Sequence, residues 1–260
     1  MRNIFVIAER DFKTYFTSPI AYVVLTIFIL LAGFFFSLIL NQVVESSTMQ
    51  AMQSAQTGQP PAARDMPGEV STAFLNVVSS IMLFIFPMIT MALFSEEKKR
   101  GTIELLLTAP ITDLQVVLGK FFAASAFYVV LLLSTLVEMS VLYVYSKPAS
   151  GPILTAYLGI LLYGLAVVAI GMFISTLTEN QIIAAVLSFG TVLLFMLLDA
   201  FARRAGESAK AVLTYLSIIE HLNDFLMGVV STSHVIYYVS LILVGLFLTY
   251  RSLDSLRWRS

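Results

Sequence analysis

Residues 95–120 read SEEKKRGTIELLLTAPITDLQVVLGK, and they lie between two hydrophobic segments that are each long enough to cross a bilayer. Three cations, ending at Arg100, close the first segment, and Gly101 follows them. Cations favour the carboxyl end of a helix, and glycine adopts the left-handed conformation that ends one. We therefore expect the first helix to end near Arg100, outside the membrane.

Two further helices are predicted in this stretch. Thr102 can cap a helix of about two turns, and Pro110 ends it because proline has no N–H for the next turn. Three apolar residues share one face of that helix: Ile103, Leu106 and Leu107. Thr112 and Gln115 then have the spacing of a capping box, which begins the next helix. A short one-sided helix outside the membrane can rest on lipid headgroups or dock on another protein, and these residues alone favour neither.

Composition determines the broad class of the protein. The chain has 260 residues, of which 58% are hydrophobic and 12% charged, and its mean hydropathy is +0.90. Soluble domains carry about 25% charged residues, so this is a polytopic membrane protein. The chain has no cysteine, which excludes disulfides, thiolate catalysis and cysteine-type zinc sites.

Six segments are apolar over the roughly 20 residues that a membrane span requires: 20–40, 73–94, 114–145, 153–174, 181–198 and 235–250. The predicted fold is therefore an all-α, six-helix transmembrane domain that occupies residues 1–260. The third segment is too long for one perpendicular crossing, so we expect it to protrude, tilt or kink. Residues 1–19 are predicted to form an amphipathic helix before the first span. Ser18, as the N-cap, and Pro19, in the first turn, begin the helix of that span.

The distribution of lysine and arginine predicts the orientation. One side of the membrane holds ten of them: Arg2, Arg10, Lys13, Lys98, Lys99, Arg100, Lys120, Arg251, Arg257 and Arg259. The other side holds five: Arg64, Lys147, Arg203, Arg204 and Lys210. By the positive-inside rule both termini and residues 95–113 are cytoplasmic. Residues 41–72, expected as a flexible or loosely helical loop, and residues 199–234, expected as one or two short helices, are then extracytoplasmic.

Enzyme chemistry is not apparent in the sequence. There is no phosphate-binding loop, HExxH or GxSxG motif, so the chain is predicted to bind no nucleotide and to be no enzyme. Glu138 is an ionisable residue inside a span, which makes it a candidate for a transport pathway, although it could also face water near the outer headgroups. His221, Asp224 and His234 could ligate a metal, but such a pair of histidines is more often structural, so no metal site is predicted.

Three stretches carry a family resemblance: ERDFKTYFTSPIAYVVLTIFILLAGFFF at 9–36, EEKKRGTIELLLTAPITDLQVVLGKF at 96–121, and EHLNDFLMGVVSTSHVIYYVSLILVGLFLTYRSLDSLRW at 220–258. They resemble the permease subunits of ABC-2 type transporters, in the branch that includes the gliding-motility and nitrous-oxide-reductase-maturation permeases. The resemblance covers essentially the whole chain. One position departs from it, because Ser233 and His234 stand where an acidic residue is expected before the last span.

The resemblance implies a multi-pass protein of the bacterial inner membrane, an exporter subunit whose residues 102–109 form a coupling helix. A separate ATP-binding subunit, which holds ATP and Mg²⁺, would dock there. The residues expected to couple to it are Glu96, Glu97, Lys98, Lys99, Arg100, Gly101, Thr102, Ile103, Glu104, Leu106 and Leu107. A second copy or a similar permease would complete the unit within the lipid bilayer. An extracytoplasmic accessory protein is a possible further partner. No nucleic-acid partner is expected.

Two other functions are compatible with a six-span chain. A channel or ATP-independent carrier would need ionisable residues along several spans, and Glu138 is almost alone in them. A membrane anchor or assembly scaffold would bind an ATPase without transport. Capture of an ATPase distinguishes the coupled permease from the carrier, and turnover in reconstituted membranes distinguishes it from the scaffold.

Overall fold

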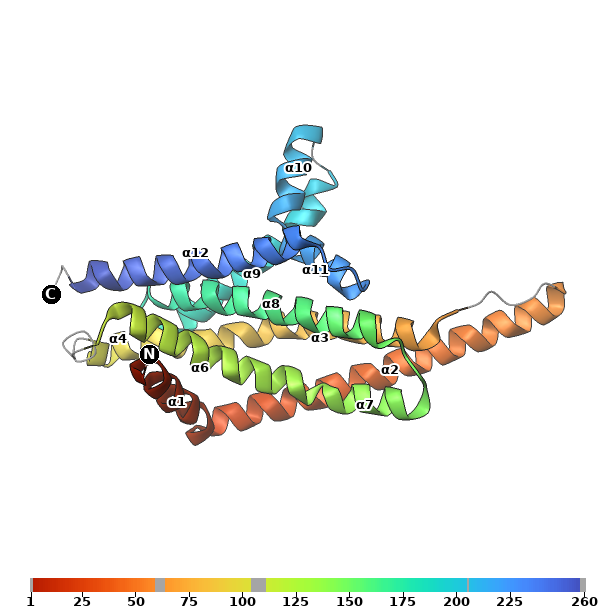
Figure 1. Cartoon of the computed structure of the whole chain (residues 1–260), viewed down its shortest axis with the longest axis horizontal. Helices are drawn as coiled ribbons and strands as arrows, with labels where there is room; N and C mark the ends of the chain where they lie inside the picture. Colours follow the sequence, from red (N-terminus) through yellow and green to blue (C-terminus); the bar gives the residue numbers. More distant parts are fainter. Residues whose placement is uncertain (1, 59–63, 104–110, 205, 258–260) are drawn as a thin grey trace.

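The computed structural model of the chain describes residues 2–58, 64–103, 111–204 and 206–257. Within these residues every long regular element is an α-helix, which confirms the all-α prediction (Figure 1). The helices are α1 (Arg2–Thr17), α2 (Pro19–Thr57), α3 (Met66–Thr90), α4 (Ala92–Lys99), α6 (Asp113–Ser134), α7 (Leu136–Tyr145), α8 (Ser150–Ser175), α9 (Gln181–Ala202), α10 (Glu207–Leu216), α11 (Ile218–Leu226) and α12 (Thr232–Arg257).

Six segments of the described chain are long and apolar enough to cross a membrane: Pro19–Thr57, Met66–Lys99, Asp113–Tyr145, Ser150–Ser175, Gln181–Ala202 and Thr232–Leu256. Each contains one of the six predicted spans, so that prediction is confirmed. The long third segment is divided at Thr135, where α6 ends and α7 begins. The Thr135 hydroxyl donates to the carbonyl of Leu132 at 2.7 Å and lies 2.8 Å from the Tyr157 hydroxyl of α8.

Helix α8 lies at the centre of the bundle, where it packs against α3, α6, α9, α11 and α12. Small residues allow this close packing. A Cβ atom at Gly164 would lie 2.1 Å from Cζ of Tyr128, and one at Gly171 would lie 2.4 Å from Oγ1 of Thr90. The helices are therefore in close contact at these two glycines.

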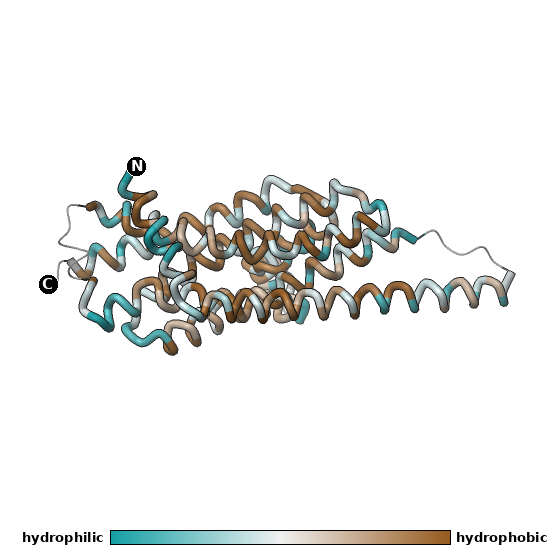
Figure 2. The backbone as a smooth tube through the Cα atoms, turned by 90° about the horizontal axis from the view of Figure 1, so that it is seen from below, coloured by the Kyte–Doolittle hydropathy of each residue, from teal (hydrophilic) through white to brown (hydrophobic). Residues whose placement is uncertain are grey.

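The first external segment differs from the loop expected for residues 41–72. Helix α2 continues without interruption to Thr57 and ends at Gly58, whose φ is 68°. Its 39 residues correspond to about 58 Å, well beyond the roughly 30 Å of the hydrocarbon core. Figure 2 shows this extension leaving the bundle as the helix changes from hydrophobic to polar. The residues after Leu40 are rich in glutamine, alanine and methionine, which extend a helix that is already nucleated.

The second external segment contains the short helices α10 and α11, as predicted for residues 199–234. Figure 1 shows α10 projecting from the side of the bundle, whereas α11 lies against it. The two termini lie at the same end of the bundle, together with α4. Helix α1 crosses this end, and the Ser18 side chain accepts a hydrogen bond from the backbone N–H of Ile20 at 3.3 Å, as expected for a helix cap.

Candidate functional site

The end of α4 separates the predicted coupling charges into two groups. Glu96, Lys99 and Arg100 lie on the outer side, where Lys99 and Arg100 are exposed and Arg100 forms an ion pair with Glu96. Glu97 and Lys98 are more enclosed and point toward other helices. We call the first three residues the outer charges and the other two the inner charges. Gly101 follows with a φ of 69°, as the predicted left-handed cap requires.

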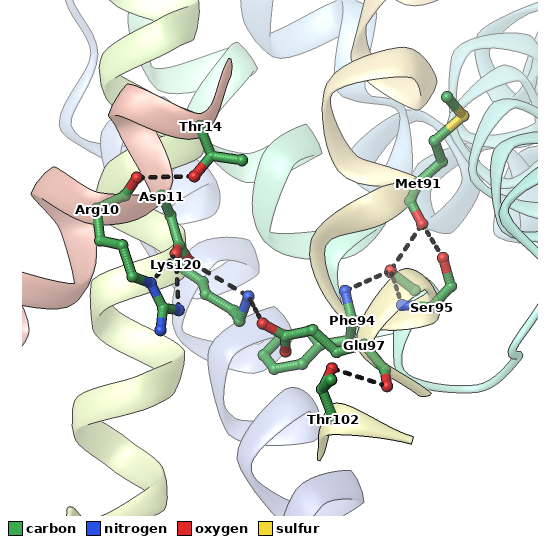
Figure 3. Close-up of polar contacts among 10 residues, drawn as sticks. Arg10, Asp11, Thr14, Met91, Phe94, Ser95, Glu97, Thr102 and Lys120 are labelled. Atoms are coloured by element: carbon green, nitrogen blue, oxygen red, sulfur yellow. Dashed lines mark hydrogen bonds and ion pairs between the residues drawn. The ribbon is translucent and has the colours of Figure 1, made fainter. Parts of the chain in front are cut away.

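A buried ion cluster receives the first of the inner charges (Figure 3). Lys120 of α6 is 4% exposed, and its Nζ lies 2.8 Å from Oε1 of Glu97 and 3.2 Å from Oδ2 of Asp11 on α1. The same ammonium group lies 5.2 Å from the centre of the Phe94 ring, which contributes a cation–π contact. The Lys120 cluster, which consists of Lys120, Asp11 and Glu97, therefore joins α1, α4 and α6.

Two neighbours complete the surroundings of this cluster. Arg10 donates through Nε to Oδ1 of Asp11 at 2.8 Å, so two cations and two carboxylates alternate in space. The Thr102 hydroxyl donates to the carbonyl of Glu97 at 3.3 Å, which ties the start of the next segment to the end of α4. A displacement of the residues after Gly101 would thus act on the same turn of α4 that holds Glu97.

The junction between α3 and α4 is held by a side chain from the central helix. Ser175 of α8 accepts hydrogen bonds from the backbone N–H groups of Phe94 and Ser95 at 3.0 and 3.1 Å, and its hydroxyl donates to the carbonyl of Met91 at 3.0 Å. These three bonds satisfy the serine hydroxyl and replace bonds within the helix at the break. Lys98, the second inner charge, donates to the carbonyl of Thr176 at the end of α8. Helix α4 is therefore fixed to α8 at two adjacent points.

Helix α1 is held against α6, and near its end it also contacts α3. Asn3 donates to Oε1 of Gln115 at 3.2 Å, and a Cβ atom at Gly119 would lie 2.6 Å from Cγ2 of Ile7, so the two helices are in close contact. The Tyr15 hydroxyl donates to the carbonyl of Ile89 at 2.9 Å, and burial raises the pKa of this tyrosine. Movement of α4 or α6 would therefore be transmitted to α1.

The other predicted coupling residues have varied positions. Ile103 is buried in the hydrophobic core of the chain itself, so it anchors its segment rather than presenting an exposed contact. Glu104, Leu106 and Leu107 lie outside the described residues. The capping box that begins α6 is confirmed, because the Thr112 side chain accepts from the N–H of Gln115 and the Gln115 side chain accepts from the N–H of Thr112, each at 3.4 Å.

Glu138 lies on α7 and is 8% exposed. Its Oε1 points toward Gly33 of α2, where an added Cβ atom would lie 3.8 Å away. Its Oε2 is buried and has no hydrogen-bond partner among the residues that the structure describes. The structure thus places this carboxylate inside the bundle, between α7 and α2, rather than on an outer surface.

The Lys120 cluster is the part of the site that sequence reasoning did not identify. The sequence places Lys120 among the cytoplasmic charges and in a stretch that carries the family resemblance, but it predicts neither Lys120 nor Asp11 as a site residue. One signal was available, because a lysine at the start of an apolar helix must pair with an acidic group when its side chain is buried. His221, Asp224 and His234 also come together, near the start of α12. Among the described residues, however, no group of three or more acidic, histidine or cysteine side chains is placed to hold a metal ion.

Comparisons with known proteins identify the family of the chain. The chain is 26% identical over 157 residues to the "Probable multidrug ABC transporter permease YbhR" of Escherichia coli strain K12 and to the protein of the same name in E. coli O157:H7. The matched region is 60% of this chain and 41% of each relative, so the match spans about two fifths of the relatives' length. The sequence model of the family described as "ABC-2 family transporter protein" matches residues 5–253. This chain therefore belongs to the ABC-2 family of transporter proteins.

Proposed function

We propose that the chain is the transmembrane permease subunit of an ABC exporter, driven by a separate ATP-binding subunit. This subunit would dock on the predicted coupling helix, residues 102–109, within the segment 95–113. The observation that carries the proposal is the division of charges at the end of α4. The outer charges are accessible to a partner, whereas the inner charges are bonded to Lys120 of α6 and to the end of α8, and Lys120 in turn is bonded to Asp11 of α1. A segment with one face toward solvent and one face toward three helices is suited to receive a movement and pass it on.

The proposed mechanism is a rigid-body movement of packed helices. ATP, with Mg²⁺, would close the partner subunits and displace the segment that follows Gly101. The bond from Thr102 to the carbonyl of Glu97 and the Lys120 cluster would carry the displacement to α4, α6 and α1. Ser175 and Lys98 would carry it to α8 and thus to the centre of the bundle. Such coupling requires contacts that differ in free energy between the two states.

A crosslinking experiment tests the docking surface. We expect a photoreactive amino acid at position 99 to crosslink to an ATP-binding subunit in native membranes, because Lys99 is exposed on the outer side of α4. Position 98 is the matched control, since the adjacent lysine points toward the carbonyl of Thr176 within the chain. Mass spectrometry of the crosslinked product identifies the partner. An equal yield of the same product from both positions, or none from position 99, would contradict the docking assignment.

The proposal extends to the partners and the direction of transport. A second copy of the chain, or a similar permease, would form the other half of the pathway, and family analogy favours export. The resemblance to the gliding-motility and nitrous-oxide-reductase-maturation branch belongs to this proposal as well. Glu138 would contribute a buried carboxylate to the pathway when α2 and α7 separate, because one of its oxygens has no partner among the described residues. The multidrug description of the YbhR relatives suggests apolar or amphiphilic cargo for this chain.

A further inference from the structure

Two histidines and an aspartate form a connected chain of hydrogen bonds between α11 and α12. His221 Nε2 lies 2.8 Å from the carbonyl oxygen of Tyr215, and its Nδ1 lies 2.6 Å from Nδ1 of His234. His234 Nε2 in turn lies 2.7 Å from Oδ2 of Asp224. The ring of His221 also stacks on Tyr237 of α12, with centroids 3.8 Å apart. We call His221, His234 and Asp224 the histidine cluster.

The number of protons in the histidine cluster follows from its donors and acceptors. The carbonyl of Tyr215 can only accept, so Nε2 of His221 must carry a hydrogen atom. The contact between the two Nδ1 atoms needs one hydrogen atom, and the contact with the Asp224 carboxylate needs another. These three contacts use three protons, whereas two neutral histidines supply two. The complete network therefore holds one added proton, whose charge Asp224 balances.

Either a lower or a higher proton count breaks the network. If the added proton leaves, two lone pairs face each other, either between the Nδ1 atoms or between His234 and the carboxylate. If a second proton is added, two hydrogen atoms meet in the 2.6 Å gap between the Nδ1 atoms. That gap is also shorter than the about 3.3 Å that separates two nitrogen ligands of a tetrahedral metal, so the geometry is that of a shared proton.

The groups around the histidine cluster come from several helices. Helix α11 contributes Glu220 beside His221. Arg203, which follows the last residue of α9, is paired with Asp199 and also interacts with Glu220. Helix α12 contributes the rings of Tyr237 and Tyr238, and Tyr215 of α10 lies edge-on to His221. Helix α8 has no charged residue, and the carboxylate of Glu69 on α3 is paired with Arg64. Asp224 is therefore the acidic group in direct contact with a histidine here.

Burial determines which histidine carries the added proton. His221 is 5% exposed, and this burial lowers the pKa of its imidazole because the charged form is poorly solvated. His221 is therefore the neutral acceptor, and His234 donates both to it and to Asp224. Because the pKa of His221 is lowered when the cluster is assembled, acidification below about 6.5 favours the open arrangement, in which this histidine is free to take up a proton.

We propose that the histidine cluster is a proton-binding site that fastens α11 to the start of α12, so that gain or loss of one proton releases this cover of the bundle. Figure 1 places α11 at the end of α12 that is farthest from the C-terminus. Helix α11 also covers α8, where a Cβ atom at Gly159 would lie 2.3 Å from Cβ of Phe225. Release of α11 would therefore uncover the central helix. The pH on that side of the membrane would set the fraction of chains in which the cover is closed.

Nitrogen NMR on the full chain in lipid nanodiscs tests the proton count directly. The sequence has two histidines, so ¹⁵N-histidine labelling gives four ring-nitrogen signals that one substitution assigns. We expect a pH range in which three nitrogens are protonated and one is not. Hydrogen exchange of the α11 backbone, corrected for the intrinsic pH effect, should be slowest in that range and faster on both sides of it.

Two carboxylate substitutions complete the test. Asp224→Asn should weaken binding of the added proton roughly 10-fold, which moves its loss about one pH unit lower, because the contacting counter-charge is removed. Glu220→Gln removes the same charge from the same helix without breaking a contact to a histidine, so its shift should be smaller. Two histidines that titrate independently and identically in the unaltered chain and in Asp224→Asn would overturn the proposal. An α11 exchange rate that does not follow the protonation state would overturn it as well.

Discussion

Replacement of Lys120 by methionine is expected to lower the free energy of unfolding by roughly 3–5 kcal/mol, because it leaves two carboxylates without their shared cation. Lys120 is 4% exposed, and Asp11 and Glu97 lie within 3.2 and 2.8 Å of its ammonium group. The measurement is SDS-induced unfolding in mixed micelles, followed by circular dichroism. A loss of this size would be the largest single-charge effect that we expect in the chain.

The matched control for Lys120→Met is Arg100→Met. Arg100 also pairs with a glutamate, Glu96, but its side chain is 69% exposed. Exposed ion pairs one helical turn apart contribute about 1 kcal/mol or less, so this variant should unfold close to the unaltered chain. Equal effects of the two substitutions would show that the Lys120 cluster does not hold the three helices together.

Gly245→Ala is expected to destabilise the bundle by roughly 1–3 kcal/mol, through overpacking between α12 and α8. A Cβ atom at this position would lie 2.8 Å from the carbonyl carbon of Ala169 and 2.9 Å from its oxygen. These are backbone atoms, which cannot turn aside as a flexible side chain can, so the two helices must separate. The same SDS titration measures the change.

Gly190→Ala is the control for this helix contact. Among the residues that the structure describes, none outside α9 has an atom within 4 Å of a Cβ atom placed at Gly190. Alanine favours a helix over glycine, so the variant should keep or raise the free energy of unfolding, by up to about 1 kcal/mol. Stabilisation by Gly245→Ala as well would mean that the contact between α8 and α12 is looser than the structure shows.

Local rules predict the helix ends of this protein well. The caps at Ser18, Gly101 and Thr112 depend on neighbours within a few residues, and all three have the expected geometry. The six spans depend on composition over about 20 residues, and they too are confirmed. The far end of α2 is predicted only as a flexible or loosely helical loop, because its polar residues lack an apolar stripe. The helix continues there through propensity and an existing nucleus.

Contacts between distant residues could not be obtained from the sequence in this way. Lys120 and Asp11 are 109 positions apart, and Ser175 lies 81 positions from Phe94, so no local pattern relates them. The charges at the end of α4 were identified as one group. The division into outer and inner charges requires the direction of each side chain, which depends on how α1, α6 and α8 pack around α4.

In the proposed mechanism the Lys120 cluster transmits ATP-driven movement from the docking segment to the bundle. The chain has no cysteine, so spin labels can be attached directly at Lys13→Cys on α1 and Leu154→Cys on α8, which are both exposed. We would measure the distance between the labels by pulsed electron paramagnetic resonance in the complex with the ATP-binding subunit, with and without ATP and Mg²⁺.

The comparison is with a triple variant, Asp11→Asn, Glu97→Gln and Lys120→Met, which removes the three charges together. Arg10 loses Asp11 as its partner in this variant, but its side chain is 55% exposed, so no buried charge is left unpaired. We predict an ATP-dependent change in the distance between the labels in the chain with the intact cluster. The triple variant should lose most of this change while position 99 still crosslinks to the partner. An ATP-dependent change of the same size in both proteins would show that the Lys120 cluster does not transmit the movement.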